Sequence, residues 1–427
     1  MRTLLVSLLA VAGCADLPPD GALECNPNPA HACPDGYQCI ADRCYRDGHG
    51  PDLAASVGDD MASFDLGDDD GGSRDGGGMS MPDLAPALCG VTGAACCAAP
   101  FAPCTNAGTI CSTDNVCVAN DVWIVGTVLG SGLTPSVGLW HYSNGVYTAY
   151  TPSAPLGVSD SHGSAIWGYA PGNFLAASDQ GEVYEDEGGT WKVCVSPDSC
   201  YASTTTSTDF SAIFGVSASD YWLGATNNSA LFHRESSAWV LRTNGLPSSF
   251  DVQRITGSAS DDIWFTGFAG TGHWNGSAWT FDNSVTGRSI WSNARNDVWA
   301  VGDNFIKHYN GTAWTAYGID GGTIPGSVWM VGGSSSTDVW ASYTVTGSTY
   351  SLAHFDGSAW TSKPVPTGST DLPSGIWMAS KTQGWIATSF GLWELKSGVW
   401  TVITLPTPTG FINNVVGGVW GSANAGH

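Results

Sequence analysis

The chain has few charged residues, and very few of them are positive. Of its 427 residues, 14 are Lys or Arg and 38 are Asp or Glu, so only 12% are charged and the formal net charge is −24. A chain this acidic is a poor partner for a polyanion, so nucleic-acid binding is not expected. The low charge, together with 56 glycines and 20 tryptophans, suits a turn-dense all-β protein better than a helical one.

The chain also lacks a long apolar segment near its start. The apolar run at residues 4–11 follows Arg2 and is too short to cross a bilayer. It ends in Val-Ala-Gly-Cys at residues 11–14, which resembles the lipobox of bacterial lipoproteins. That resemblance implies that residues 1–13 are a signal peptide and that Cys14 is lipidated. It also implies the outer membrane or cell surface, because Ala15 and not Asp follows the cysteine. An ordinary secretory signal with a chance cysteine is the alternative.

The thirteen cysteines indicate an oxidising compartment. With Cys14 set apart, the other twelve fall into local sets of four, six and two. The set of four has no close C-x2-C pair, so disulfides are favoured over a zinc site. Spacing leaves the connectivity of the set of six open. The disulfide candidates are Cys25, Cys33, Cys39, Cys44, Cys89, Cys96, Cys97, Cys104, Cys111, Cys117, Cys194 and Cys200.

Composition divides the chain into four parts after the signal peptide. Residues 14–49 hold the four-cysteine set and resemble the Dickkopf-like or EGF-like modules that follow lipoboxes in myxobacterial proteins. Residues 50–88 are an acidic Gly- and Asp-rich linker that cannot bury enough apolar surface to order itself, so a disordered tether is expected. Residues 89–117 hold six cysteines and resemble a knottin-like module. Residues 118–427 contain internal repeats.

From Asp121 onward, a unit of four short predicted strands recurs. In the clearest copy, residues 289–317, aromatic and β-branched runs alternate with turn residues. The dipeptide Asn310-Gly311 predicts a two-residue hairpin loop with positive φ at both positions. A second-strand motif begins at Asp121, Asn173, Asp220, Asp262, Asp297, Asp338 and Gln383. A first-strand motif lies at Ile166, Ile213, Ile255, Ile290, Val328, Ile376 and Val419.

The order of the copies predicts how the domain closes. No first strand precedes Asp121, and a lone first-strand motif stands at residues 418–421 near the C-terminus. Four-stranded repeats with this offset predict a seven-bladed β-propeller closed by the C-terminal strand. Six or eight blades remain alternatives if a degenerate copy is miscounted. The expected fold class is therefore all-β, with small disulfide-rich modules and a disordered linker before the propeller.

One repeat carries a family motif. Residues 184–191, YEDEGGTW, match the Asp-box S-x-D-x-G-x-T-W at four of its five defined positions. The repeats thus resemble BNR or Asp-box propellers and the WD-repeat-like propellers of bacterial surface lipoproteins. This resemblance implies a glycan-active hydrolase or lyase as one alternative function. Sialidases of that type carry a Phe-Arg-Ile-Pro motif, which is absent here. The unpaired acidic candidates in predicted inter-blade loops are Asp160, Asp251, Asp320 and Asp371.

The histidines and tryptophans follow the repeat. One histidine lies in the third strand of each of five blades, at His141, His233, His273, His308 and His354. Equivalent positions are spread around the ring, so these residues are predicted to be structural and not to form a metal site. The repeated aspartates before the second strands are predicted to form Asx-turns. Packing between blades explains the tryptophans, although some are free to line the central channel. No catalytic residue, metal or cofactor is assigned.

These observations favour a monomeric, lipid-anchored binding or scaffolding protein. The propeller from Asp121 onward carries 22 acidic and 10 basic residues, spread among many neutral polar ones, which favours a protein or neutral glycan partner. The loop from Cys194 to Cys200 is either a staple or a marker of the recognition face, and it is the candidate ligand-binding loop. A glycan-active enzyme and a structural envelope component are the alternative functions.

The anchor has a direct test. Replacing Cys14→Ser removes the residue to be lipidated, so the protein is expected to move from the membrane fraction to the soluble fraction of fractionated cells. Cys25→Ser, which lies outside the lipobox, serves as the matched control. If the Cys14 variant stayed in the membrane fraction like the control, lipidation at this position would be wrong.

Overall fold

The computed structural model describes residues 37–40, 43–46, 109–111, 117–119, 121–130, 135–150, 162–170, 173–187, 191–194, 209–217, 219–235, 238–345, 349–366, 371–407 and 411–421. The chain divides into two compact units, residues 1–80 and 81–427. The first unit contains one hairpin, β1 (Tyr37–Ile40) with β2 (Arg43–Arg46). The second begins with the hairpin β3 (Thr109–Cys111) and β4 (Cys117–Ala119). Within these ranges no helix could span a membrane.

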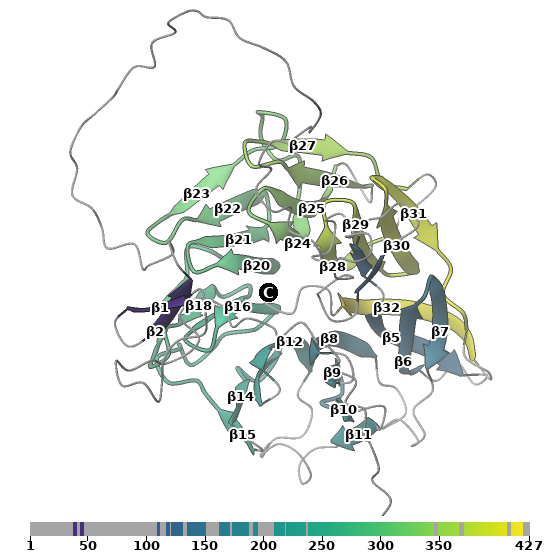
Figure 1. Ribbon diagram of the computed structural model, residues 1–427, viewed down its shortest axis with the longest axis horizontal. Helices are drawn as coiled ribbons and strands as arrows, with labels where there is room; N and C mark the ends of the chain where they lie inside the picture. The colour runs from purple at the N-terminus through teal and green to yellow at the C-terminus, as the bar shows by residue number, and fades with distance from the viewer. Residues whose placement is uncertain are drawn as a thin grey trace, which may run out of the picture. The chain divides into compact units, whose positions relative to one another are not determined.

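Seven four-stranded antiparallel sheets follow, arranged around one axis as the blades of a propeller (Figure 1). Blade 1 contains β32 (Phe411–Gly421), β5 (Val122–Gly130), β6 (Pro135–Ser143) and β7 (Val146–Tyr150). Blade 2 contains β8 (Gly163–Ala170), β9 (Asn173–Ser178), β10 (Val183–Glu187) and β11 (Trp191–Cys194). Blade 3 contains β12 (Phe210–Ser217), β13 (Asp220–Ala225), β14 (Leu231–Glu235) and β15 (Ala238–Leu241).

The remaining blades follow in chain order, each from its inner to its outer strand. Blade 4 contains β16 (Arg254–Ala259), β17 (Asp262–Thr266), β18 (Thr271–Trp274) and β19 (Trp279–Asp282). Blade 5 contains β20 (Ser289–Ala294), β21 (Asp297–Gly302), β22 (Phe305–Tyr309) and β23 (Trp314–Tyr317). Blade 6 contains β24 (Val328–Ser335), β25 (Asp338–Thr344), β26 (Tyr350–Phe355) and β27 (Trp360–Lys363). Blade 7 contains β28 (Pro373–Ser380), β29 (Gln383–Thr388), β30 (Gly391–Lys396) and β31 (Val399–Ile403).

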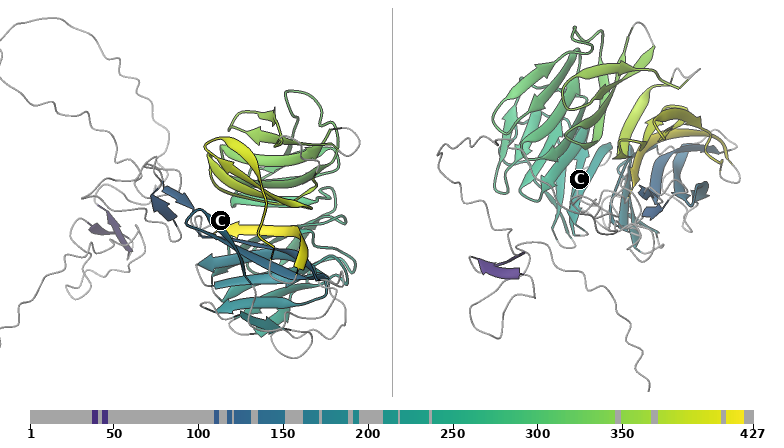
Figure 2. Two further views of the ribbon diagram at one scale, coloured as in Figure 1. Left: turned by 90° about the vertical axis from the view of Figure 1, so that its right-hand side faces the viewer. Right: turned by 45° about the horizontal axis from the view of Figure 1, so that its top comes forward.

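The ring closes as the repeat order predicts. The last strand, β32, pairs with β5 and supplies the inner strand of blade 1, with Trp420 opposite Trp123. Figure 2 shows this yellow C-terminal strand among the blue strands of blade 1. Trp420 is buried, and its ring centroid lies 5.2 Å from that of Phe174 in blade 2. The C-terminal strand therefore joins the first and last parts of the propeller. The all-β, seven-bladed prediction is confirmed.

The core lies between neighbouring sheets, where the repeated tryptophans pack. All six residues of the second strand β21 are buried, while the outer strand β23 is partly exposed. Trp299 of blade 5 meets Trp360 of blade 6 edge to face, with centroids 5.3 Å apart. Each second strand is thus sandwiched between two sheets, which explains its continuous apolar sequence. Packing between blades accounts for these rings, as expected.

The prediction of a two-residue loop at Asn310-Gly311 is wrong in its turn type. Tyr309 pairs with Trp314, so four residues connect β22 to β23, and only the glycine has positive φ, at 92°. The Asn310 side-chain oxygen accepts hydrogen bonds from the amides of Thr312 and Ala313, at 3.0 and 2.9 Å. The asparagine therefore closes the longer turn with its side chain.

Two-residue loops with positive φ at both positions do occur elsewhere. They connect β6 to β7 and β30 to β31, at Asn144-Gly145 and Ser397-Gly398.

The alignment of the first strand of blade 6 also needs a correction. Val331 lies opposite Ala341, just as Ile290 lies opposite Ala300 in blade 5, so Val331 and not Val328 is the equivalent residue. A register shift between residues 328 and 330 explains the error, because a bulge adds residues that sequence spacing counts as strand. Trp329 consequently falls outside the repeated tryptophan position.

Ring closure predicts a severe effect of truncation. Removing residues 411–427 deletes β32 and leaves β5 as an unpaired inner edge, so we expect loss of cooperative thermal unfolding and aggregation. The matched control removes only residues 422–427, which follow the strand, and is expected to unfold at the wild-type temperature. A cooperative transition of the longer truncation near the wild-type temperature would contradict closure by this strand.

Candidate functional site

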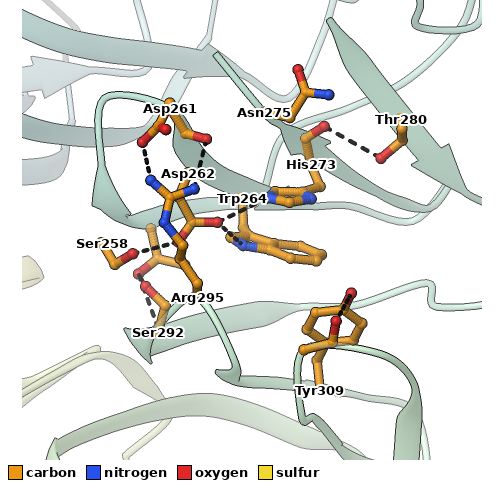
Figure 3. Close-up of polar contacts among 12 residues, drawn as sticks. Ser258, Asp261, Asp262, Trp264, His273, Asn275, Thr280, Ser292, Arg295 and Tyr309 are labelled. Atoms are coloured by element: carbon orange, nitrogen blue, oxygen red, sulfur yellow. Dashed lines mark hydrogen bonds and ion pairs between the residues drawn. The ribbon is translucent and has the colours of Figure 1, made fainter. Parts of the chain in front are cut away.

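Each of the five aligned histidines is bound by an aspartate of its own blade. The aspartate begins the second strand, and the histidine Nε2 lies 2.6 to 2.8 Å from its Oδ1. In blade 4, Trp264 Nε1 donates to the same Asp262 oxygen at 3.0 Å, and the rings of Trp264 and His273 stack 3.8 Å apart (Figure 3). The five pairs are Asp121–His141, Asp220–His233, Asp262–His273, Asp297–His308 and Asp338–His354.

This arrangement holds strands together and does not gather the histidines. Among the described residues, no group of three or more His, Cys, Asp or Glu is placed to hold a metal ion. The aspartates bind side chains of neighbouring strands, whereas the sequence had suggested backbone amides in Asx-turns. The aspartates contact side chains because they lie inside the sheet and not in a turn. Asp262, for example, is paired with Ala259 of the inner strand. Its carboxylate therefore lies level with the tryptophan and histidine beside it.

The environment of Asp262 favours its charged form. Burial raises the pKa of this carboxyl. Hydrogen bonds from His273, Ser258 and Trp264 lower the pKa by more than burial raises it, so the net pKa lies below its ordinary value. The Ser258 hydroxyl donates to the second carboxylate oxygen, so both oxygens are used (Figure 3). This carboxylate is a structural anion and not a free base.

Blades 2 and 7 carry glutamates where the other blades carry histidine, a substitution that sequence reasoning missed. In blade 2, Glu185 stands opposite Leu175 and forms an ion pair with Arg234 of blade 3 at 2.5 Å. In blade 7, Glu394 stands opposite Trp385 and accepts a hydrogen bond from Tyr147 of blade 1 at 3.1 Å. Burial raises the pKa of Glu394. Both acids connect a blade to its neighbour, and aligning them with the histidines would have revealed them.

The seven inner strands line a central channel of about 160 Å³. Its described walls contain small and apolar residues, and four tryptophans are among them, as the sequence allowed: Trp167, Trp291, Trp377 and Trp420. No Asp or Glu lies among the described lining residues. Arg254 is the one charged residue of that lining.

The acidic candidates that the structure describes, Asp251, Asp320 and Asp371, are not among the residues that line this channel. Asp251 accepts hydrogen bonds from the amides of Phe268 and Ala269, both at 3.0 Å. Asp320 accepts one from the amide of Ser362 at 3.0 Å. These two carboxylates hold loops in place. Asp371 is 3.4 Å from the hydroxyl of Thr388, and Asp160 lies outside the described residues.

One end of the propeller, which we call the entry face, is where the seven inner strands begin. In an antiparallel blade, the loops between second and third strands lie at the same end. Phe268 and Phe390 occupy two of these loops and are 55% and 71% exposed. They are the two exposed aromatic side chains of the described residues. Buried rings dominate elsewhere, so this exposure sets the entry face apart.

An arginine on the entry face is held between two aromatic rings. The Arg288 guanidinium carbon lies 4.3 Å from the ring centroid of Trp329 and 5.3 Å from that of Phe268. Its Nε donates to Asp303 at 3.0 Å, and that hydrogen bond lowers the pKa of the Asp303 carboxyl. Trp329 Nε1 donates to the hydroxyl of Thr344 at 2.7 Å. Because Val328 was aligned with the repeat and the tryptophans were attributed to packing between blades, this cluster was not predicted from the sequence.

The cysteine candidates are only partly within the described residues. Cys194 ends β11 opposite Val183, which places its backbone at the entry face, whereas Cys200 lies outside the described residues. Backbone register places Cys39 opposite Cys44 and Cys111 opposite Cys117. The other candidates lie outside the described residues: Cys14, Cys25, Cys33, Cys89, Cys96, Cys97 and Cys104.

Comparison with known proteins gives similar folds and no family. No protein-family model matches the chain, and no curated protein matches its sequence. Virginiamycin B lyase from Staphylococcus aureus is similar at 14% identity and TM-score 0.48, over 62% of this chain and 92% of the lyase. YCF48 bound to D1 peptide is similar at 12% identity and TM-score 0.45, over 57% of this chain and 82% of YCF48. The neighbours thus include an enzyme and a peptide-bound protein.

The Asp262 site predicts an acid-dependent loss of stability. The pKa of Asp262 in the folded protein lies below the unfolded value of about 3.9. The ionised carboxylate therefore stabilises the fold above about pH 3.9, and this stabilisation is lost as the pH falls through the folded pKa. Asp262→Asn should lower the free energy of unfolding by about 1 to 3 kcal/mol near pH 6, with a smaller difference near pH 3.

Urea unfolding of both proteins at the two pH values measures this effect. Asp261→Asn, which changes a neighbouring carboxylate that is 54% exposed, is the control and should change stability little at either pH. A difference between Asp262→Asn and wild type that stayed constant with pH would show that the carboxylate charge does not contribute.

Proposed function

We propose that this chain is an exported, lipid-anchored binding protein whose propeller docks a protein partner through the entry face. The observation that carries the proposal is the Phe268–Arg288–Trp329 stack. Packing between blades does not explain this stack, because Trp329 lies outside the repeated tryptophan position. The lipobox resemblance at residues 11–14 supports the anchor.

The chemistry of the stack suits a protein interface. Aromatic residues and arginine are enriched at the energetic centres of such interfaces. Arg288 is already fixed between two rings and by Asp303, so it would lose little side-chain entropy on binding. Phe390 adds a second exposed ring on the same face. A preorganised cation beside exposed rings is a favourable anchor for a partner.

The sparse charge of the propeller supports a largely uncharged contact. With 22 acidic and 10 basic residues from Asp121 onward, few ion pairs are available to a partner. Binding should therefore respond weakly to salt. A neutral glycan would share this property.

Binding is favoured over glycan cleavage by the composition of the channel. Hydrolysis of the common type needs two carboxyl groups roughly 5 to 10 Å apart. Over the part of the chain that the structure describes, the channel wall supplies none. The entry-face cluster, in contrast, provides contact residues without an acid pair.

Site-specific photo-crosslinking in cells that make the full chain tests the docking face. The crosslinker 4-benzoylphenylalanine replaces Phe268 or Phe390 on the entry face. In matched controls it replaces Val146 or Val399, which are 59% and 61% exposed in or beside hairpins at the opposite end of the blades. We expect adducts from the entry-face positions only, with yields that change less than about twofold between low and high salt.

Each outcome bears on a different part of the proposal. Equal adducts from all four positions, or none from the entry face, would contradict docking there. Arg288→Ala should reduce the adduct yield from position 390 if the stack forms part of the interface. An adduct that carries glycan and no added peptide by mass spectrometry would replace the protein partner with a glycan.

A further inference from the structure

Arg254 differs in kind from the residues at the equivalent position of the other six blades. Strand register places it level with one residue from the inner strand of every other blade. Five of these six residues are small, and the sixth is a methionine. The equivalent residues are Ala165, Ala212, Ser289, Met330, Gly375 and Gly418. Six blades therefore form without a charge at this position, so blade packing does not require the arginine.

The guanidinium group meets only neutral atoms. Its Nη2 donates to the carbonyl oxygen of Ser374 in blade 7 at 2.5 Å and lies 3.7 Å from the sulfur of Met330 in blade 6. Its Nη1 donates to the carbonyls of Gln253 and Ser211, at 2.6 and 3.4 Å. No described carboxylate lies within ion-pair distance, and no described acceptor takes the Nε hydrogen.

The charge is therefore held in the channel without a counter-charge. Burial alone lowers the pKa of Arg254 to about 10, so the group stays protonated at neutral pH. A desolvated charge is costly unless an opposite charge or a full set of hydrogen bonds accompanies it. Carbonyl oxygens offset part of this cost, and one N–H remains unused. An anion in the channel would supply both the opposite charge and an acceptor for this hydrogen.

The channel limits what that anion can be. Tryptophans and aliphatic side chains line the described wall, and at about 160 Å³ the cavity is about half the size of the smallest typical ligand pockets. A polysaccharide chain or a nucleotide would not fit. A carboxylate oxygen can accept the remaining Nε hydrogen and supply the opposite charge, and a small apolar body suits the aromatic wall.

We propose that the propeller channel binds a small carboxylate that carries an apolar group, with Arg254 as its ion-pair partner. The carboxylate belongs either to a free small acid or to the end of a peptide chain. The assignment does not rest on docking at the entry face, because it concerns the channel and its test uses no partner protein.

Calorimetric titration of the full chain with benzoate and benzamide tests the proposal. The two probes share a ring and differ in charge, so their ratio reports the ion pair. We expect benzoate to bind at least tenfold more tightly than benzamide. Arg254→Met should abolish this preference, while its melting temperature confirms folding, since methionine occupies the equivalent position in blade 6. Arg254→Lys keeps a charge but lacks the Nε hydrogen and the Nη donors, and it should weaken benzoate binding severalfold.

Arg295→Met is the matched control, because it removes an exposed arginine that lies outside both the channel lining and the entry-face stack. It should bind benzoate like the wild type. Equal binding of benzoate and benzamide, no binding of either, or unchanged benzoate binding by Arg254→Met would each overturn the proposal.

A final pair of probes distinguishes the two sources of the carboxylate. They are an acetylated pentapeptide ending in leucine with a free C-terminus and the same peptide amidated. Tighter binding of the free peptide than of benzoate, lost on amidation and in Arg254→Met, would support a chain terminus. Preference for benzoate over both peptides would support a small acid.

Discussion

In three of the seven blades, one carboxylate connects three of the four strands. In blade 4, Asp262 at the start of β17 accepts from Trp264 in its own strand, from His273 in β18 and from Ser258 in β16. Blade 6 repeats the pattern with Ser334, and blade 5 uses Asn293 in place of the serine. The inner, second and third strands are thereby fixed in mutual register at one level of the sheet. Without this contact, hairpins alone would set the register, and a one-residue slip would turn the buried tryptophans outward.

Blades 2 and 7, which lack the aspartate–histidine pair, have a contact between blades at the same position. Glu185 pairs with Arg234 of blade 3, and Glu394 receives the hydroxyl of Tyr147 from blade 1. Blades 2 and 7 both flank blade 1, which is completed by the C-terminal strand. Glu394 thus bridges blades 7 and 1 at the closure, where segments from both ends of the propeller meet, whereas Glu185 bridges blades 2 and 3. Closure is stabilised both by strand pairing and by polar contacts between neighbouring sheets.

Sequence reasoning predicted what the repeat determines and missed what departs from it. The strand order, the closure by residues near Trp420 and the separation of the five histidines all follow from counting repeated motifs. The turn at Asn310 could not be typed, because a side-chain cap converts the expected two-residue loop into a four-residue one. The register of blade 6 failed at Val328, because a bulge has no sequence signature in a chain this rich in glycine and serine. The role of Arg254 depends on atoms contributed by three other blades, which no local pattern contains.

One of these failures, the register of blade 6, concerns a residue of the proposed docking site, because it hid the position of Trp329. A closed ring of similar blades places equivalent residues at equal radius, so a structural residue should recur from blade to blade. The Asp–Trp–His contact recurs in this way and needs no ligand to explain it. Arg254 and Trp329 do not recur. Arg254 introduces a charge among small residues at equivalent positions of the inner strands. Trp329 places an indole beside Arg288, outside the repeated tryptophan position. Glu185 and Glu394 also depart from the repeat, but each has a partner in the neighbouring blade that explains it, whereas the repeat explains neither the charge of Arg254 nor the ring of Trp329. The proposed docking face and the proposed channel site each rest on one residue that breaks the repetition of the blades.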